Sequence, residues 1–238
     1  MIHSVLSYVI TTHAYTRSMT ARKHEFTDTI DWDRYWQDRS EDASEEYTAS
    51  VSGGHYERVA RFFDQVGIPD DAAFVGCGPS SLSVKIATKF PDMHVVGCDA
   101  AWSVIKENRD EYAGLSNLTF EQAILPTFDI DQEFDFVFCY ATLHYVREIE
   151  RAIENLYAHV RSDGHFVFNY PNRAYQDDHQ GAEGQLRERL QLPINGENLL
   201  SQERIADILD ADVRDFWEFV DTDGPFVRPA NPCVIVDR

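Results

Sequence analysis

Apolar residues gather from residue 72 onwards in short, nearly continuous runs, and amphipathic segments separate these runs. The segments 82–90, 102–112 and 146–160 carry their apolar residues at helical spacing. Five runs have the length and composition of strands buried on both faces of a sheet: residues 72–77, 95–98, 118–120, 134–139 and 165–169. Strands that alternate with helices predict a doubly wound α/β fold with a mostly parallel sheet.

Further elements are expected on both sides of these strands. Residues 31–37 and 56–66 have helical patterns and would cap the sheet or cover a site. Residues 201–209 have the pattern of a helix, and residues 213–220 and 233–236 have that of strands. The last two strands would pair as a hairpin at the sheet's edge, which gives a seven-stranded sheet with an antiparallel edge.

The chain is expected to form one domain over residues 25–238, because 238 residues with 43% hydrophobic composition supply one substantial core. Residues 1–24 are expected to be a disordered extension, although a start at Met19 would also explain why residues 1–18 contain no acid. The domain divides into N-terminal cap helices, a central core, a polar segment that would act as a lid, and a closing helix with its strand pair: residues 25–68, 72–170, 171–200 and 201–238.

The charge balance excludes some classes of partner. Acidic residues outnumber basic residues by 41 to 21, for a formal net charge of -20. This charge repels nucleic-acid phosphates and anionic membrane surfaces, so we predict a small-molecule substrate, no nucleic acid and no membrane. The chain has few lysines and many aspartates. This composition resembles that of protein surfaces from salt-rich cytoplasms, where ions screen the repulsion between carboxylates. A merely acidic protein is the alternative.

The cysteines and the apolar runs bear on compartment and metal binding. The four cysteines have neither the spacing of a zinc site nor that of a disulfide framework, so no metal is predicted. No apolar run approaches the roughly 20 residues that a membrane span requires. Residues 1–18 also lack the charged start and cleavage site of a secretory signal. These features predict a cytoplasmic protein.

A glycine turn follows the first predicted strand, in the stretch FVGCGPSSL at residues 74–82. Gly76 and Gly78 let the backbone approach a ligand closely, and the next helix offers unpaired N–H groups at its start. The second strand ends in Asp99, 23 residues after Gly76, near the offset of about 20 residues at which a carboxylate reaches ribose hydroxyls. Together these features favour a bound adenosyl group.

With these motifs in order, residues 72–170 resemble the class I S-adenosylmethionine-dependent methyltransferases. The stretch FDFVF at residues 134–138 is similar to the family's F-D-x-V run, and Leu143-His144 to its L-H-x-V segment. Residues 163–168 look like its P-G-G-x-L-x-I stretch. The resemblance implies S-adenosylmethionine as the cofactor and a Rossmann-like fold. It assigns cofactor contacts to the turn and to the ends of the second and fourth strands: Gly76, Cys77, Gly78, Ser80, Asp99, Ala100 and Cys139.

Three departures from the family pattern keep other functions open. Phe74 replaces an acid, Ser80 replaces the third glycine, and residues 123–124 lack the acid that often follows the third strand. A non-catalytic or weakly active adenosyl-binding relative is therefore one alternative. An NAD-dependent dehydrogenase is another, because Asp99 would also suit a dinucleotide, although the full G-x-G-x-x-G is missing.

Methyl transfer needs a base only when the acceptor carries a proton that must leave. His144 is the first candidate, because the loop after the fourth strand opens onto the crevice where such sheets bind ligands. Tyr140 is the second candidate catalytic residue, and its expected role is to orient the acceptor. The aromatic residues Trp32, Tyr35 and Trp36 are interpreted as packing anchors. The sequence identifies neither the acceptor nor the oligomeric state.

Overall fold

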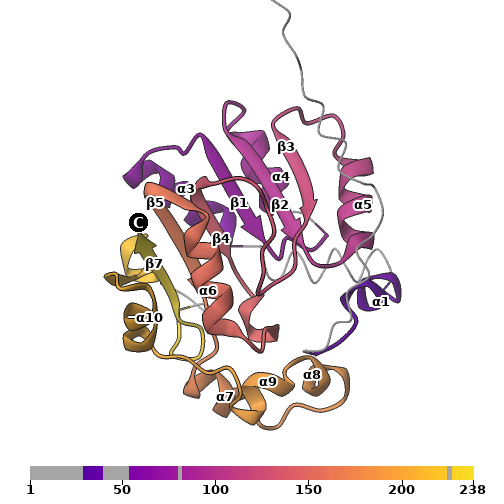
Figure 1. The fold of residues 1–238 in the computed structure, drawn as a ribbon, viewed down its shortest axis with the longest axis vertical. Helices are drawn as coiled ribbons and strands as arrows, with labels where there is room; N and C mark the ends of the chain where they lie inside the picture. The colour runs from indigo at the N-terminus through magenta and orange to yellow at the C-terminus, as the bar shows by residue number, and fades with distance from the viewer. Residues whose placement is uncertain (1–28, 40–53, 80–81, 224–226) are drawn as a thin grey trace, which may run out of the picture.

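The computed structural model describes residues 29–39, 54–79, 82–223 and 227–238. The predicted extension at residues 1–24 and the predicted contact Ser80 lie outside these ranges. The described chain forms a single seven-stranded sheet in the order β3-β2-β1-β4-β5-β7-β6 (Figure 1). The strands are β1 (Asp71–Val75), β2 (His94–Asp99), β3 (Leu118–Gln122), β4 (Phe134–Cys139), β5 (Val160–Asn169), β6 (Val213–Asp215) and β7 (Cys233–Asp237).

Strands β1 to β5 are parallel, and β7 pairs antiparallel with both β5 and β6. The predicted doubly wound sheet with an antiparallel edge is therefore confirmed. Strand order reverses between β1 and β4, where the chain crosses from one half of the sheet to the other. In sheets of this kind ligands bind beyond the carboxyl ends of the strands at that position.

Successive side chains of each strand point to opposite faces, so the sheet has two apolar layers. Helices α6 (Ile149–Ala158) and α10 (Gln202–Leu209) cover one face, against Val137, Phe166 and Val234 among others. The other face carries Phe74, Phe136 and Val167. The helices that cover it are α3 (His55–Val66), α4 (Leu82–Lys89), α5 (Trp102–Glu111) and α11 (Phe216–Phe219).

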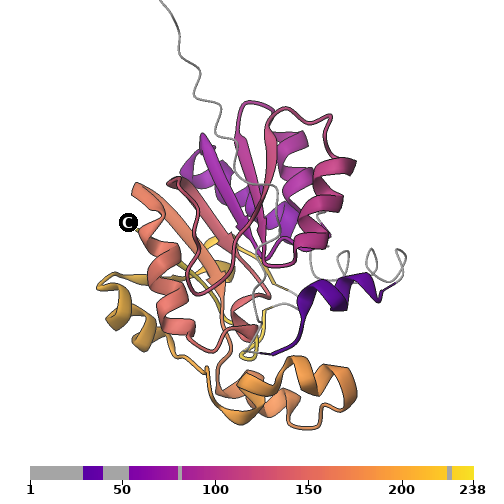
Figure 2. The same cartoon turned by 45° about the vertical axis from the view of Figure 1, so that its right-hand side comes forward.

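The segment after β5 is helical, whereas the sequence predicted one helical piece near residues 186–190. It forms α7 (Arg173–His179), α8 (Gly184–Arg189) and α9 (Gln191–Asn195). Together with α1 (Trp32–Gln37), these helices lie beyond the carboxyl ends of the parallel strands (Figure 2). The polarity of the segment follows from its position, since only α9 buries a run of apolar residues.

The strand predicted over residues 213–220 is wrong in its second half. β6 ends at Asp215, whose side chain accepts a hydrogen bond from the Glu218 N–H at 2.8 Å and caps α11. Phe216 and Trp217 are then buried from a helical turn. A short segment rich in apolar residues is compatible with either structure, and the capping aspartate favours the helix.

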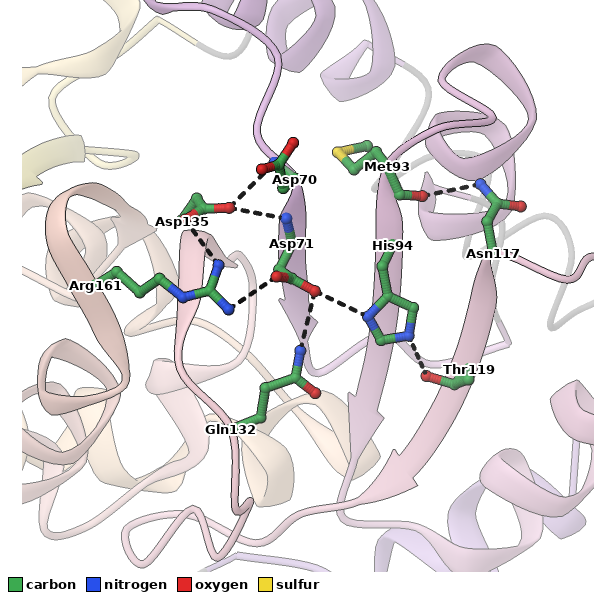
Figure 3. Close-up of polar contacts among 9 residues, drawn as sticks. All are labelled: Asp70, Asp71, Met93, His94, Asn117, Thr119, Gln132, Asp135 and Arg161. Atoms are coloured by element: carbon green, nitrogen blue, oxygen red, sulfur yellow. Dashed lines mark hydrogen bonds and ion pairs between the residues drawn. The ribbon is translucent and has the colours of Figure 1, made fainter. Parts of the chain in front are cut away.

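A polar network joins the amino ends of the strands, opposite the ligand-binding edge (Figure 3). Arg161 binds Asp135 at 2.9 Å and Asp71 at 2.8 Å, and Asp71 also contacts His94 at 3.1 Å. Asp135 accepts the backbone N–H groups of Asp70 and Asp71 as well. Burial tends to raise the pKa of Asp135, but Arg161 and these N–H groups outweigh it and hold the pKa below its ordinary value. The network fixes the register of four strands.

None of the helices in the described part of the chain is both long and apolar enough to cross a membrane.

Candidate functional site

The turn after β1 has the backbone conformation that glycine favours. Gly76 has φ of +73° and Gly78 has φ of +56°. The N–H groups of Gly76 and Cys77 both donate to the Cys98 carbonyl, at 2.8 and 2.9 Å, so the turn folds against the end of β2. A β-carbon at Gly76 would come within 1.9 Å of the Thr142 hydroxyl oxygen. Glycine is therefore required at position 76 for space as well as for conformation.

Asp99 closes β2 and turns its carboxylate toward this glycine turn. One oxygen accepts the Gly78 N–H at 2.9 Å, and the other accepts the Ala101 N–H at 2.9 Å. Burial raises the pKa of Asp99, whereas the N–H groups of Ala101 and Gly78 act in the opposite direction. Each oxygen accepts one of these bonds and keeps a further lone pair. The carboxylate can therefore accept hydroxyl groups in addition to its backbone partners.

The end of β3 lies beside Asp99. The Gln122 side-chain amide donates to the Ala100 carbonyl at 2.9 Å, and the Ala123 N–H donates to the Asp99 carbonyl at 3.0 Å. Gln122 thus occupies the region where the family pattern often has an acid. No sequence motif identifies this side chain, because its position depends on the pairing of β2 with β3.

A third segment of the site follows β4. Ala141 has φ of +54° and donates its N–H to the Asn169 side-chain oxygen at 2.7 Å. The Tyr140 hydroxyl donates to the Asn231 side-chain oxygen at 3.0 Å, and Asn169 donates to that oxygen at 3.3 Å. Burial raises the pKa of Tyr140. Tyr140 is therefore a neutral phenol within a polar network that joins the ends of β4 and β5 to the start of β7.

His55 stacks on Tyr140 with ring centroids 3.9 Å apart. It is the first residue of α3 and is almost completely buried. Burial, with the Arg58 charge as a smaller cause, lowers the pKa of His55 to about 3. Sequence analysis missed His55, because a single histidine at the start of an amphipathic helix forms no recognisable motif.

His144 lies in the short 3-10 helix η1 (Leu143–Tyr145) and has 3% of its surface exposed. Its ring centroid is 4.4 Å from that of Tyr175 on α7. Burial lowers the pKa of His144 to about 3, with a smaller effect from His179, so the imidazole is neutral. Its Nδ1 atom has no hydrogen-bond partner among the described residues. A buried polar atom of this kind calls for a water or a ligand group.

Asn198 holds the 3-10 helix in place from the segment that follows α9. Its side-chain amide donates to the carbonyl oxygens of His144 and Val146, at 3.1 and 3.0 Å, and more weakly to that of Leu143 at 3.3 Å. The position of His144 therefore depends on a residue more than 50 positions away. Nothing in the local sequence around Asn198 predicts this contact.

Three cysteines lie at or next to the ends of strands near the candidate site. Cys98 and Cys139 are fully buried at the ends of β2 and β4, and burial raises both thiol pKa values, that of Cys139 to about 12. Burial likewise raises the pKa of Cys77. A protonated thiol is a poor nucleophile and metal ligand. The described residues also contain no group of three or more His, Cys, Asp or Glu side chains arranged to hold a metal.

Helix α1 brings aromatic residues to the same edge. The Trp32 ring lies 4.7 Å from that of Tyr145, and a β-carbon on Gly78 would lie 3.6 Å from the Trp36 ring. The expected packing anchors are thus found beside the glycine turn and the turn after β4. Asp33 was not predicted; it accepts hydrogen bonds from the backbone N–H and the hydroxyl of Ser103, at 2.7 and 2.8 Å.

Residues 74–166 match the model of a family described as a methyltransferase domain. A malonyl-[acyl-carrier protein] O-methyltransferase from Bacillus cereus is 22% identical over 116 residues, which cover 48% of this chain and 43% of that protein. A trans-aconitate 2-methyltransferase from Variovorax paradoxus is 28% identical over 119 residues, covering 49% and 45%. The chain therefore spans less than half the length of these curated relatives.

Solved structures support the same fold. The structure described as PigF with SAH superposes with a TM-score of 0.60 and 16% identity, covering 87% of this chain and 62% of that one. An O-methyltransferase family protein from Burkholderia thailandensis has a TM-score of 0.58 and 14% identity, covering 83% and 59%. Likenesses at such identities establish the arrangement of helices and strands.

The two glycines of the turn should respond differently to alanine. We expect Gly76→Ala to reduce the free energy of unfolding by about 2–4 kcal/mol, because positive φ strain adds to overlap with Thr142. Gly78→Ala should cost about 1–2 kcal/mol, since only the backbone is strained. Urea unfolding of both variants measures the difference. Equal losses would contradict the tight contact at Gly76.

Proposed function

We propose that this chain, which has the class I S-adenosylmethionine-dependent methyltransferase fold and matches a methyltransferase-domain family over residues 74–166, transfers a methyl group from S-adenosylmethionine to a small-molecule acceptor. The observation that carries the proposal is the hydrogen bond from Gly78 to Asp99. It joins the turn and the acid that the family pattern requires in one buried arrangement. The acceptor and the cofactor contacts of individual residues are part of this proposal.

The residues of this edge fit the cofactor. Gly76 and Gly78 carry no side chains, and Thr142 beside Gly76 and Trp36 beside Gly78 bound the space in which a ligand would approach the backbone of the turn. Asp99 retains lone pairs for two ribose hydroxyls, and the small side chain of Ala100 leaves room beside it, whereas Cys139 is fully buried in the core. When bound, S-adenosylmethionine supplies an activated methyl group on a sulfonium. The protein then needs chiefly to align the acceptor with that methyl group and to exclude water.

The names of the relatives indicate which classes of acceptor should be tested first. Their names state transfer to malonyl-[acyl-carrier protein], trans-aconitate and juvenile hormone acid. Each of these compounds carries a carboxyl group. A carboxylate needs no proton removed before methylation, which suits a site whose histidines are buried and neutral. We therefore propose small carboxylic acids as the first acceptor panel and free hydroxyl and amine compounds as the second.

We also propose that the chain is adapted to a salt-rich cytoplasm. The net charge of -20 supports this, because carboxylates at such density repel one another unless ions screen them. The temperature of thermal unfolding should rise when potassium chloride is raised from dilute to molar concentration. A melting temperature that does not respond to salt would contradict the adaptation.

Ligand titration tests the proposed function. S-adenosylmethionine, S-adenosylhomocysteine and NAD are titrated separately into the unaltered chain in concentrated potassium chloride. We expect both adenosyl compounds to bind, and Asp99→Ala to weaken them by about 1–3 kcal/mol through loss of a charged acceptor. Asp110→Ala removes an exposed acid paired with Lys106 on α5 and serves as the control.

Three results of this titration would count against the proposal or restrict it. Binding of NAD without the adenosyl compounds would favour a dehydrogenase. Unchanged affinity in Asp99→Ala would remove that residue from the site. Adenosyl binding with no methylated product from either acceptor panel, by mass spectrometry, would favour a non-catalytic relative.

His144 is proposed as the base for acceptors that must lose a proton. We expect His144→Asn to lower kcat for such acceptors by about 100-fold, with a much smaller loss for a carboxylate. Because its pKa is about 3, His144 stays neutral above that value, and the rate should show no loss centred near pH 6.5. Kinetics from pH 5 to 8 check this. A rate that falls below an apparent pKa near 6.5 would contradict the lowered pKa of His144, and an unchanged kcat in His144→Asn would exclude His144 as the base.

A further inference from the structure

Helix α1 spans two loops of the carboxyl edge, although it belongs to the segment before the core. At one end Trp32 packs on Tyr145, which follows β4. At the other end the Trp36 ring lies over Gly78, with two ring atoms 3.6 and 3.8 Å from the place of a β-carbon there. The helix therefore contacts both the glycine turn and the turn after β4, the two loops that border the proposed cofactor site.

The contact between α1 and α5 is polar and specific. Asp33 accepts both donors of Ser103, at 2.7 and 2.8 Å, in the first turn of α5. Asp99 accepts the Ala101 N–H immediately before that helix. The two acids thus take donors two residues apart at one helix start, where the dipole favours negative charge. The position of α1 is linked through α5 to the residue proposed to bind ribose.

Other contacts tie α1 to the helices after β5. The Tyr35 hydroxyl accepts hydrogen bonds from Arg39 at 2.7 Å and from Arg189 of α8 at 2.8 Å. The Arg189 guanidinium also lies 5.0 Å from the Tyr35 ring centroid. Helix α1 therefore stands between the cofactor turn and the segment α7–α9, the arrangement visible in Figure 2.

The packing of α1 differs from that of the core helices. None of its six residues is buried, whereas α3 buries five of its twelve. A short helix without buried residues gains little from the hydrophobic effect. Its place depends on the side-chain contacts of Trp32, Asp33, Tyr35 and Trp36 and not on burial in the core, so displacement of α1 would leave the packing of the sheet intact.

We propose that α1 forms the outer wall of the cofactor site, with Trp36 closed over the glycine turn and Asp33 holding the helix closed through Ser103. This inference rests on the proposed function, because the ligand it covers is the adenosyl cofactor. Asp33 is a positioning residue in this arrangement, and Trp36 is a cofactor contact. Closure of α1 and binding of the cofactor stabilise each other.

Two aspartates of the same segment provide a matched comparison. Asp33→Ala removes the bonds to Ser103, whereas Asp38→Ala removes an exposed acid whose partner is Arg34 at 3.4 Å. Both variants lose one negative charge. In calorimetry with S-adenosylhomocysteine in concentrated potassium chloride, we expect Asp33→Ala to bind about tenfold more weakly, mainly through faster dissociation. Asp38→Ala should stay within about twofold of the unaltered chain.

Trp36 provides a readout that needs no turnover. Addition of S-adenosylhomocysteine should change the tryptophan emission of the unaltered chain and of Trp32→Phe, and this change should be clearly smaller in Trp36→Phe, in which Trp102 at the start of α5 remains. Asp33→Asn keeps one acceptor oxygen and should weaken binding less than Asp33→Ala does. Circular dichroism and melting temperatures establish that each variant is folded before its affinity is compared.

The outcomes separate this inference from the proposed function. If the unaltered chain does not bind S-adenosylhomocysteine, both are overturned. If it binds but Asp33→Ala and Asp38→Ala have equal affinity, only the role of α1 is overturned. If Asp33→Ala binds more tightly, α1 obstructs the cofactor instead of closing over it, and the inference is overturned as well. An emission change in Trp36→Phe as large as that of the unaltered chain also excludes Trp36 as the contact.

Discussion

The site depends on one hydrogen bond, from the Gly78 N–H to the Asp99 carboxylate. A buried carboxylate is costly unless donors surround it, and the glycine turn and the start of α5 supply those donors. In return, the carboxylate fixes the turn in a conformation with two positive φ angles. The parallel pairing of β1 with β2 makes this hydrogen bond possible. It places Val75 beside Cys98, so the glycine turn that follows β1 lies next to Asp99 at the end of β2.

Much of the central sheet follows from sequence because its strands are apolar on both faces. Residues 134–139 were predicted as the strand that the structure contains, and the order of motifs identified the glycine turn and Asp99. The helices α7 to α9 were largely missed, since a segment at the sheet's rim buries few residues and shows weak periodicity. The short strand β6 was extended too far, because a short segment rich in apolar residues suits a strand or a helical turn equally.

The site residues that sequence missed share a different property. His55, Asp33 and Asn198 act through partners that lie far away in the chain: Tyr140, Ser103 and the carbonyls of the 3-10 helix η1. No local pattern contains such contacts, so they become visible only when the topology is known. The aromatic residues of α1 were noticed for their composition, but their position over the turn required the structure. Ser80 lies outside the described residues, and its role stays a prediction.

The amino ends and the carboxyl ends of the strands have different roles. At the amino ends, Arg161 and its aspartates tie four strands together, and at the carboxyl ends the loops carry the proposed chemistry. Loops and short helices at the carboxyl edge can therefore be exchanged while the sheet keeps its register. Under the proposed function, such a division would allow the acceptor to be changed by replacing α7 to α9 without altering the sheet. The same scaffold would then be a starting point for changing specificity by segment grafting, with the end of β2, the proposed ribose contact, left unchanged.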